Sequence, residues 1–360
     1  MASTTATRQR EAVDPSVRCG QWLNAWAPWI VILGLGGWAA VARTDQFVVG
    51  IIIGTLYALA AVGLTMIYGI TNVPHFAHGD SMMMAAYLAF LVFAGAVLGA
   101  GDGDAVLPIN VAMLPGATER IWEFSFGYGL ILALVIGVLL MIPVYLAIDR
   151  VVYQRLARMG AGTAILAVAS LGVAITIRGA MLMVWGPTSR RYTTGIRDTI
   201  QIPGLPRIVA DQFFILVVAI GLTVAAYVVL YRTTLGTTMR AAADNPDLAR
   251  ASGIDTAVTR RWTWIIGGGL TAVAGILLAL QSQLTPELGF VLLLPIFAAM
   301  ILGGIGNPFG AFLGGLIVGV VGEVSVSLGI ISPGYKTGVA FVVLIVVILF
   351  RPRGLFGAKA

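Results

Sequence analysis

The sequence is poor in charged residues. Only 11% of its 360 residues are Asp, Glu, Lys or Arg and 59% are hydrophobic, whereas a soluble domain carries about a quarter charged residues. A soluble fold is therefore excluded for most of the chain. The mean hydropathy of +0.95 and the 45 glycines instead indicate membrane helices that pack closely through small residues.

Cysteine and histidine are also scarce. Cys19 is the single cysteine, so an intramolecular disulfide and a cysteine-based metal cage are excluded. His75 and His78 lie three residues apart with Asp80 nearby, but a fourth metal ligand is lacking, so we expect hydrogen bonds there and no metal site. The basic residues form no stripe with interleaved aromatics, which argues against nucleic acid as a partner.

The sequence also lacks a loop that could bind ATP. Such a loop needs Gly-x4-Gly-Lys-Ser/Thr, because consecutive backbone N–H groups must surround the phosphates while the lysine reaches over them. The nearest approach is residues 329–337, where Tyr335 interrupts the pattern. We therefore predict no catalytic residues, no cofactor bound by this chain and no enzyme activity of its own.

Long apolar runs are present instead. A spanning helix needs about 20 mostly apolar residues, and such runs occupy residues 24–42, 47–70, 81–100, 128–148, 163–185, 213–231, 262–282, 290–305, 309–330 and 335–350. The sequence predicts an all-α, polytopic transmembrane bundle of about ten spans over residues 24–350, with polar tails at 1–23 and 351–360. The first run is longer than the apolar core of a signal peptide, so we expect it to be retained.

The basic residues predict the orientation. With the N-terminus inside, the inner connections and tails collect 14 Lys and Arg residues and the outer connections collect 7. Since inner loops carry the excess of positive charge, both termini are expected to be cytoplasmic. The long connections 101–127 and 186–212 then lie outside.

A polar segment interrupts the apolar pattern between the second and third runs. Gly, Asn and Pro break the pattern at residues 68–80, and freed backbone groups are tolerated in lipid only where protein or a water-filled cavity satisfies them. The functional interpretation is a broken helix that lines a translocation path, and the alternative is a plain inner loop. Candidate path residues here are Tyr68, Asn72, His75, Phe76, His78 and Asp80.

Two charges lie inside predicted spans. Arg178 and Glu323 each lie seven residues before the outer end of a run, so both are about 10 Å deep. Because an unpaired charge in lipid costs a few kcal/mol, we expect these residues to pair with each other or to face the path. The alternative is that Arg178 extends outward to the surface.

The inner connection at 232–260 is unusually long for a connection. Its alanine-rich part at 237–243 predicts a short helix, Asn245-Pro246 a turn, and 247–252 a second helix that stops at Gly253. Two short helices on the inner surface would form a docking platform, and the alternative is a solvated loop.

Glycines also recur in the last third of the chain. Gly306, Gly310 and Gly314 are spaced four apart, which predicts close helix packing within the chain or against another subunit. The turn at 303–308 and the break at 69–80 lie one in each half of the chain. This supports the hypothesis of an inverted repeat.

Several of these motifs resemble the permeases of branched-chain amino acid ABC importers. They are Gly54–Leu59, Tyr68–Gly69, Phe76–Asp80, Leu235–Gly236, Arg240–Ala241, Asp244–Asn245, Ala249, Gly253–Ile254, Ile301–Asn307 and Leu349–Phe356. The resemblance covers about 310 residues. His75 stands where the family has Asn, after an unusual Pro74, and these departures bear on the substrate more than on the fold.

The resemblance implies a division of labour. Two permeases form the path, two cytoplasmic subunits bind ATP-Mg, and a periplasmic binding protein delivers a branched-chain amino acid or similar small solute across the bacterial inner membrane. We expect the second permease to be a paralogue, and the alternative is an identical copy. The resemblance assigns the ATPase-coupling loop to Gly236, Arg240, Ala241, Asp244, Asn245, Ala249 and Gly253. The rival hypothesis is an ATPase-independent carrier or channel for urea or an amide, which would not need the platform.

Overall fold

The computed structural model describes residue 34 and residues 36–39, 41–97, 105–106, 110–193, 197–201, 206–329, 331–351 and 353–357. Its helices are α2 (Thr44–Thr71), α3 (His78–Ala94), α4 (Tyr128–Ile148), α5 (Gln154–Arg158), α6 (Thr163–Trp185), α7 (Ala210–Arg232), α8 (Thr234–Asp244), α9 (Pro246–Ala251), α10 (Thr256–Gln281), α11 (Leu288–Gly303), α12 (Pro308–Ser327) and α13 (Lys336–Phe350). A π-helical turn, η3 (Asp149–Tyr153), joins α4 to α5, and the 3-10 turns are η2 (Val111–Met113) and η4 (Pro333–Tyr335).

The predicted polytopic helical bundle is confirmed. Seven of the described helices are long and apolar enough to cross a membrane, and α3 and α11 are apolar but shorter. These nine correspond to nine of the ten predicted runs. The first run, at 24–42, and the tail at 1–23 lie largely or wholly outside the described residues.

The predicted end of the third run is wrong by several residues. The run was expected to continue to residue 100, but α3 ends at Ala94 because Gly95 adopts a left-handed conformation with φ 68°. Its N–H group bonds to the carbonyl of Leu91, which is a common way to end a helix. Hydropathy alone could not find this end, since the residues that follow are still apolar.

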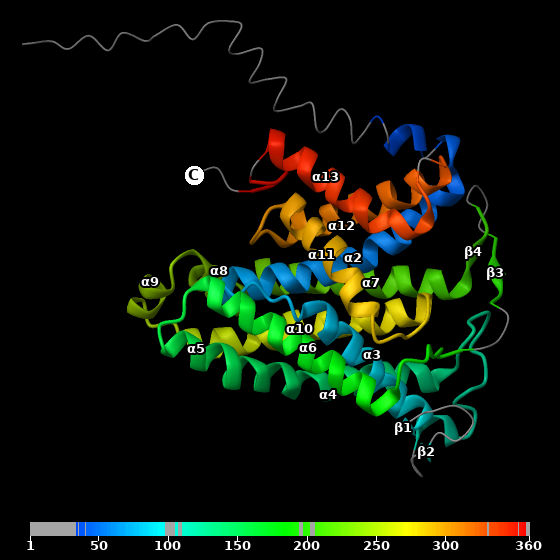
Figure 1. The fold of residues 1–360 in the computed structure, drawn as a ribbon, viewed down its shortest axis with the longest axis horizontal. Helices are drawn as coiled ribbons and strands as arrows, with labels where there is room; N and C mark the ends of the chain where they lie inside the picture. Colours follow the sequence, from blue (N-terminus) through cyan, green and yellow to red (C-terminus); the bar gives the residue numbers. More distant parts are fainter. Residues whose placement is uncertain are drawn as a thin grey trace, which may run out of the picture.

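The helices lie side by side, and their connections gather at two ends (Figure 1). The first, which we call the α8–α9 end, carries α5, α8, α9 and the end of α13. The second, the hairpin end, carries two short antiparallel pairs, β1 (Ala96–Val97) with β2 (Ala105–Val106) and β3 (Thr199–Ile200) with β4 (Ile208–Val209). The connections predicted to be inner therefore share one end.

Helices α2 and α10 form the centre of the bundle. Both are buried along much of their length, and α2 packs closely on α12. Glycines make this contact: a Cβ on Gly315 would lie 2.4 Å from Cα of Ala58, and one on Gly319 would lie 2.3 Å from Cα of Gly54. Of the glycines predicted to pack, Gly310 and Gly314 approach the backbone of α11 closely, whereas Gly306 has open space around it. The glycine spacing within α12 thus serves packing within the chain, which is one of the two alternatives predicted.

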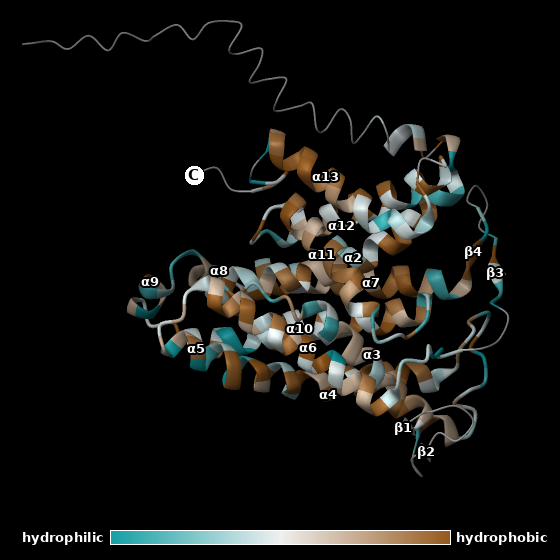
Figure 2. Cartoon of the chain, viewed as in Figure 1, coloured by the Kyte–Doolittle hydropathy of each residue, from teal (hydrophilic) through white to brown (hydrophobic). Residues whose placement is uncertain are grey.

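The outer helices turn apolar side chains outward. Exposed examples include Val168 and Met183 of α6 and Leu349 of α13. Hydrophobic colour runs along these helices, while hydrophilic colour appears near α5 and α9 at one end and near β3 at the other (Figure 2). An apolar exterior with polar ends is expected of a bundle whose solvent is lipid.

Candidate functional site

The break predicted from the sequence is present between α2 and α3. Helix α2 ends at Thr71, and Asn72 caps it in the left-handed conformation with φ 52°. The hydroxyl of Ser170 on α6 then serves the irregular segment: it donates to the carbonyl of Pro74 at 2.8 Å and accepts from the N–H of Phe76 at 3.0 Å. The protein itself therefore satisfies these two backbone groups of the break, as lipid requires.

Both histidines of the break are buried. His75 Nδ1 lies 2.8 Å from the hydroxyl of Tyr153, and His78 Nε2 lies 3.0 Å from the carbonyl oxygen of Ala60. The ring of His75 also packs edge-on against Trp264, with centroids 5.2 Å apart. The expectation that hydrogen bonds hold this segment in place is confirmed. Within the described residues, no cluster of three or more His, Cys, Asp or Glu side chains could hold a metal ion.

Asp80, in the first turn of α3, forms an ion pair with Arg178 of α6. Arg178 Nε donates to Oδ1 at 2.9 Å and Nη2 donates to Oδ2 at 3.0 Å, while the Asp80 side chain is 1% exposed and that of Arg178 is 25% exposed. The guanidinium also lies 4.7 Å from the ring centroid of Phe290 on α11. Phe290 is exposed, so this buried pair opens onto the bundle surface between α6 and α11.

Of the two alternatives predicted for Arg178 and Glu323, pairing with each other is wrong. Lys336, at the start of α13, donates to both carboxylate oxygens of Glu323 at 2.6 and 2.8 Å. The sequence pattern predicts the same depth in the membrane for Arg178 and Glu323, but two residues can pair only if they also lie on the same side of the bundle. Helix α6 packs on α3, whereas α12 packs on α2, α11 and α13.

The remaining path candidates lie around these groups. Phe76 stacks on Phe297 of α11 with ring centroids 5.1 Å apart, and both rings are half-buried. Asn72 is exposed and Tyr68 is half-buried at the end of α2. Phe76 thus borders the same α11 helix that carries Phe290, whereas the two histidines face the interior of the chain.

The two short helices meet at their N-termini. A Cβ on Gly79 would lie 2.0 Å from the carbonyl oxygen of Gly289, and one on Gly289 would lie 2.2 Å from that of Gly79. Helix α3 follows α2 and α11 follows α10, and each helix of the first pair contacts both helices of the second. At about 25 Å each, α3 and α11 are shorter than a bilayer core. This arrangement supports the inverted-repeat hypothesis.

The two predicted platform helices are confirmed as α8 and α9. Thr233 caps α8 by accepting from the N–H of Gly236, and Asn245 caps α9 by accepting from the N–H groups of Asp247 and Leu248. A Cβ on Gly236 would lie 2.2 Å from the carbonyl oxygen of Leu230, so only glycine fits the close approach of α8 to α7. Gly253 has φ +84° but open space around it.

The other platform candidates divide between the two faces of these helices. Ala249 is buried and Ala241 is half-buried, whereas Arg240, Asp244 and Asn245 are exposed. Arg250 pairs locally with Asp247, which was one of the two alternatives. Arg240 instead lies over the ring of Tyr231, 5.1 Å from its centroid.

A chain of contacts connects the platform to the break. Asp255 caps α10 at the end of the platform, and five residues later Arg260 Nε donates to both carboxylate oxygens of Asp149 at 3.0 Å. Asp149 begins the π-helical turn η3, which ends at Tyr153, the partner of His75. Sequence analysis missed Asp149, Tyr153 and Arg260. An acid directly after an apolar run was the available signal for Asp149.

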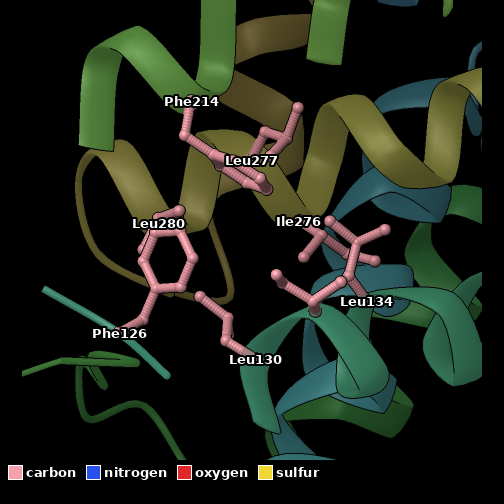
Figure 3. A pocket seen from close by; sticks show the side chains of 8 residues that line it. Phe126, Leu130, Leu134, Phe214, Ile276, Leu277 and Leu280 are labelled. Carbon is pink, nitrogen blue, oxygen red and sulfur yellow. The ribbon is translucent and has the colours of Figure 1, made fainter. Parts of the chain in front are cut away.

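A small cavity lies among apolar side chains of α4, α7 and α10 (Figure 3). It measures about 10 Å³ and is lined by residues such as Phe126, Phe214 and Leu277. A cavity must reach about 10–15 Å³ and offer polar partners to hold even one water. This space is therefore a packing gap and not a solute site.

Comparisons with known proteins agree with the family resemblance seen in the sequence. The sequence profile described as "Branched-chain amino acid transport system / permease component" matches residues 46–348. The high-affinity branched-chain amino acid transport system permease protein BraD of Pseudomonas aeruginosa is 31% identical over 87% of this chain and 95% of that protein. LivH of Escherichia coli, with the same description, is 28% identical over the same shares.

A more distant relative covers part of the chain. The autoinducer 2 import system permease protein LsrC of Klebsiella pneumoniae is 33% identical over 41% of this chain and 44% of that protein. No solved structure matches the chain.

Proposed function

The chain belongs to the permease family of branched-chain amino acid transport systems, and from this premise we propose that it is the membrane-spanning subunit of an ATP-binding-cassette importer. It is a multi-pass membrane protein, proposed to lie in a bacterial inner membrane with both termini in the cytoplasm. Its solute is a branched-chain amino acid or a similar small molecule delivered by a periplasmic binding protein. The observation that carries the proposal is the α8–α9 platform on a bundle of this family.

The proposed coupling surface is the exposed side of α8 and α9, onto which two cytoplasmic ATP-binding subunits dock. The buried side of the platform is held to the bundle at Gly236 and is continuous with α10 through Asp255. A rigid element that contacts the ATPase and continues into the spans can transmit a domain movement. The Arg260–Asp149 and Tyr153–His75 contacts extend this connection to the break.

The proposed path runs along the surface between α6 and α11, where Arg178 reaches out of its pair with Asp80. A guanidinium with free donors beside an aromatic ring suits the carboxylate and apolar side chain of an amino acid. The α6 surface around it exposes Gly172, Thr176 and Gly179, and small residues of this kind let another helix approach closely. We propose that the second permease, a paralogue, covers this surface.

Uptake into proteoliposomes tests the proposal. The chain is reconstituted with its second permease, ATP-binding subunits and binding protein, and uptake of radiolabelled leucine is measured against competing valine, urea and short amides. The importer requires that uptake depend on ATP and on the binding protein. The rival carrier or channel predicts uptake by the chain alone without ATP, and that result would replace the proposal.

A further inference from the structure

We infer that the chain carries a second site, on the α8–α9 end, that binds a free zwitterionic amino acid with an apolar side chain. The site is a cavity of about 220 Å³, open to solvent on one side, between α8, the ends of α2 and α7, and the turn before α12. Drug-sized ligands occupy pockets of about 300–1,000 Å³. The volume here therefore suits a smaller solute, of the size of one amino acid.

The lining has the two charges that a zwitterion requires. Arg240 and Asp244 both line the cavity, and they lie four residues apart on α8, so they lie on one face of the helix about one turn apart. Within the described part of the chain no ion pair joins them. A guanidinium binds a carboxylate through parallel hydrogen bonds, and the Asp244 carboxylate can accept from an ammonium group.

The helix itself adds to this charge pattern. Asp244 is the last residue of α8, and the last turn of α8 contains no basic residue. The C-terminal end of a helix carries partial negative charge, which favours a cation there. The ammonium group is thus placed at Asp244, and the carboxylate is placed one turn earlier at Arg240.

The rest of the cavity is suited to an apolar side chain. Met66 and Ile70 of α2, Leu230 of α7 and Met239 of α8 line it. Small-molecule sites are mostly apolar with a few polar groups that fix the orientation of the ligand. A leucine or isoleucine side chain would replace water against these four residues, whereas a strongly polar side chain would lose its hydration there.

The location gives the site a regulatory role, and this part of the inference rests on the proposed function. Gly236 fixes the start of α8 against α7, while the cavity lies under the later part of α8. A solute in the cavity would stay between α8 and the bundle and oppose any closing of that gap. Amino acid accumulated on the α8–α9 side would therefore slow its own import.

Binding of radiolabelled L-leucine to the full chain in nanodiscs tests the site without requiring transport. We expect saturable binding that Arg240→Gln and Asp244→Asn each weaken at least tenfold. The matched controls Arg250→Gln and Asp247→Asn change the same residue types on neighbouring α9 and should leave the affinity within twofold. All four side chains are exposed, and size-exclusion chromatography verifies that each variant is folded.

Analogues and partners complete the test. L-Leucinamide, which lacks the carboxylate, and 4-methylpentanoate, which lacks the ammonium group, should each compete at least tenfold more weakly than leucine. Absence of leucine binding, equal binding by the variants and controls, or equal competition by either analogue overturns the site. Loss of binding when the ATP-binding subunits are added shows that a partner side chain fills the cavity, which overturns the regulatory role. If ATP-driven uptake fails while leucine binding is intact, the proposed importer function is refuted and the binding site is not.

Discussion

Removing one member of the Asp80–Arg178 pair should leave a charge in the membrane interior without its partner. Truncating one side of a buried ion pair costs about 3–5 kcal/mol. The Asp80 side chain is 1% exposed and that of Arg178 is 25% exposed, and a long arginine can extend toward the surface. We therefore expect Arg178→Met, which isolates the carboxylate, to destabilise the chain more than Asp80→Leu.

The double substitution separates stability from function. Replacing both charges by apolar residues of similar volume removes the unpaired charge, so stability should return to within about 1 kcal/mol of the original protein. If Arg178 contacts the solute, uptake stays abolished in this variant. Recovery of both stability and uptake would mean that the pair is purely structural and that the path lies elsewhere.

Unfolding by SDS in mixed micelles gives the free energies, and ATP-driven uptake gives the function. Arg120–Asp198 is the matched control, since its side chains are 43% and 49% exposed. Arg120→Met should cost about 0–1 kcal/mol, as expected for a surface ion pair. The reasoning is refuted if Arg178→Met costs no more than Arg120→Met, or if the two single effects simply add in the double variant.

Three further predictions concern the platform, the break and the orientation. Gly236→Leu should displace α8, because even a Cβ there lies 2.2 Å from a carbonyl oxygen of α7. This variant should abolish the stimulation of ATPase activity by solute-loaded binding protein. The control Gly253→Ala has open space around it, so it should lower the free energy of unfolding by about 1–2 kcal/mol and retain stimulation. Tyr153→Phe removes the 2.8 Å contact between the Tyr153 hydroxyl and His75 Nδ1, so it should lower the free energy of SDS unfolding by about 1–3 kcal/mol. An unchanged free energy would show that this contact does not stabilise the break. In a chain without native cysteine, an impermeant thiol reagent on intact cells should label a cysteine at Ser189 and not at Ser252, whereas the reverse pattern would invert the proposed orientation.

The candidate site could be predicted in part. The break at residues 68–80 and the platform at 232–260 were identified because Gly, Asn, Pro and polar residues interrupt apolar runs, and such interruptions are local. The caps at Thr233 and Asn245 are likewise encoded within a few residues of the helices that they begin. Local sequence thus located both regions.

The partners of the charged residues could not be predicted. Arg178 binds Asp80, which is 98 residues away in the chain, and Arg260 binds Asp149, which is 111 residues away. Sequence position gives the depth of a residue in a span, since each residue adds about 1.5 Å. It does not give the rotation of a helix about its axis or the identity of its neighbours, which is why pairing of Glu323 with Arg178 stood among the alternatives.

The sequence by itself determined that the chain is a helical membrane protein, where nine of its apolar helices lie, and which segments interrupt them. The physical reason is that lipid requires every spanning backbone to satisfy its own hydrogen bonds, so a sufficient run of apolar residues becomes a helix wherever it occurs. The tertiary structure decided that α3 and α11 meet at Gly79 and Gly289, and that Asp80 is neutralised by Arg178. These contacts depend on which helix faces are small enough to approach one another, and that is a property of the whole bundle.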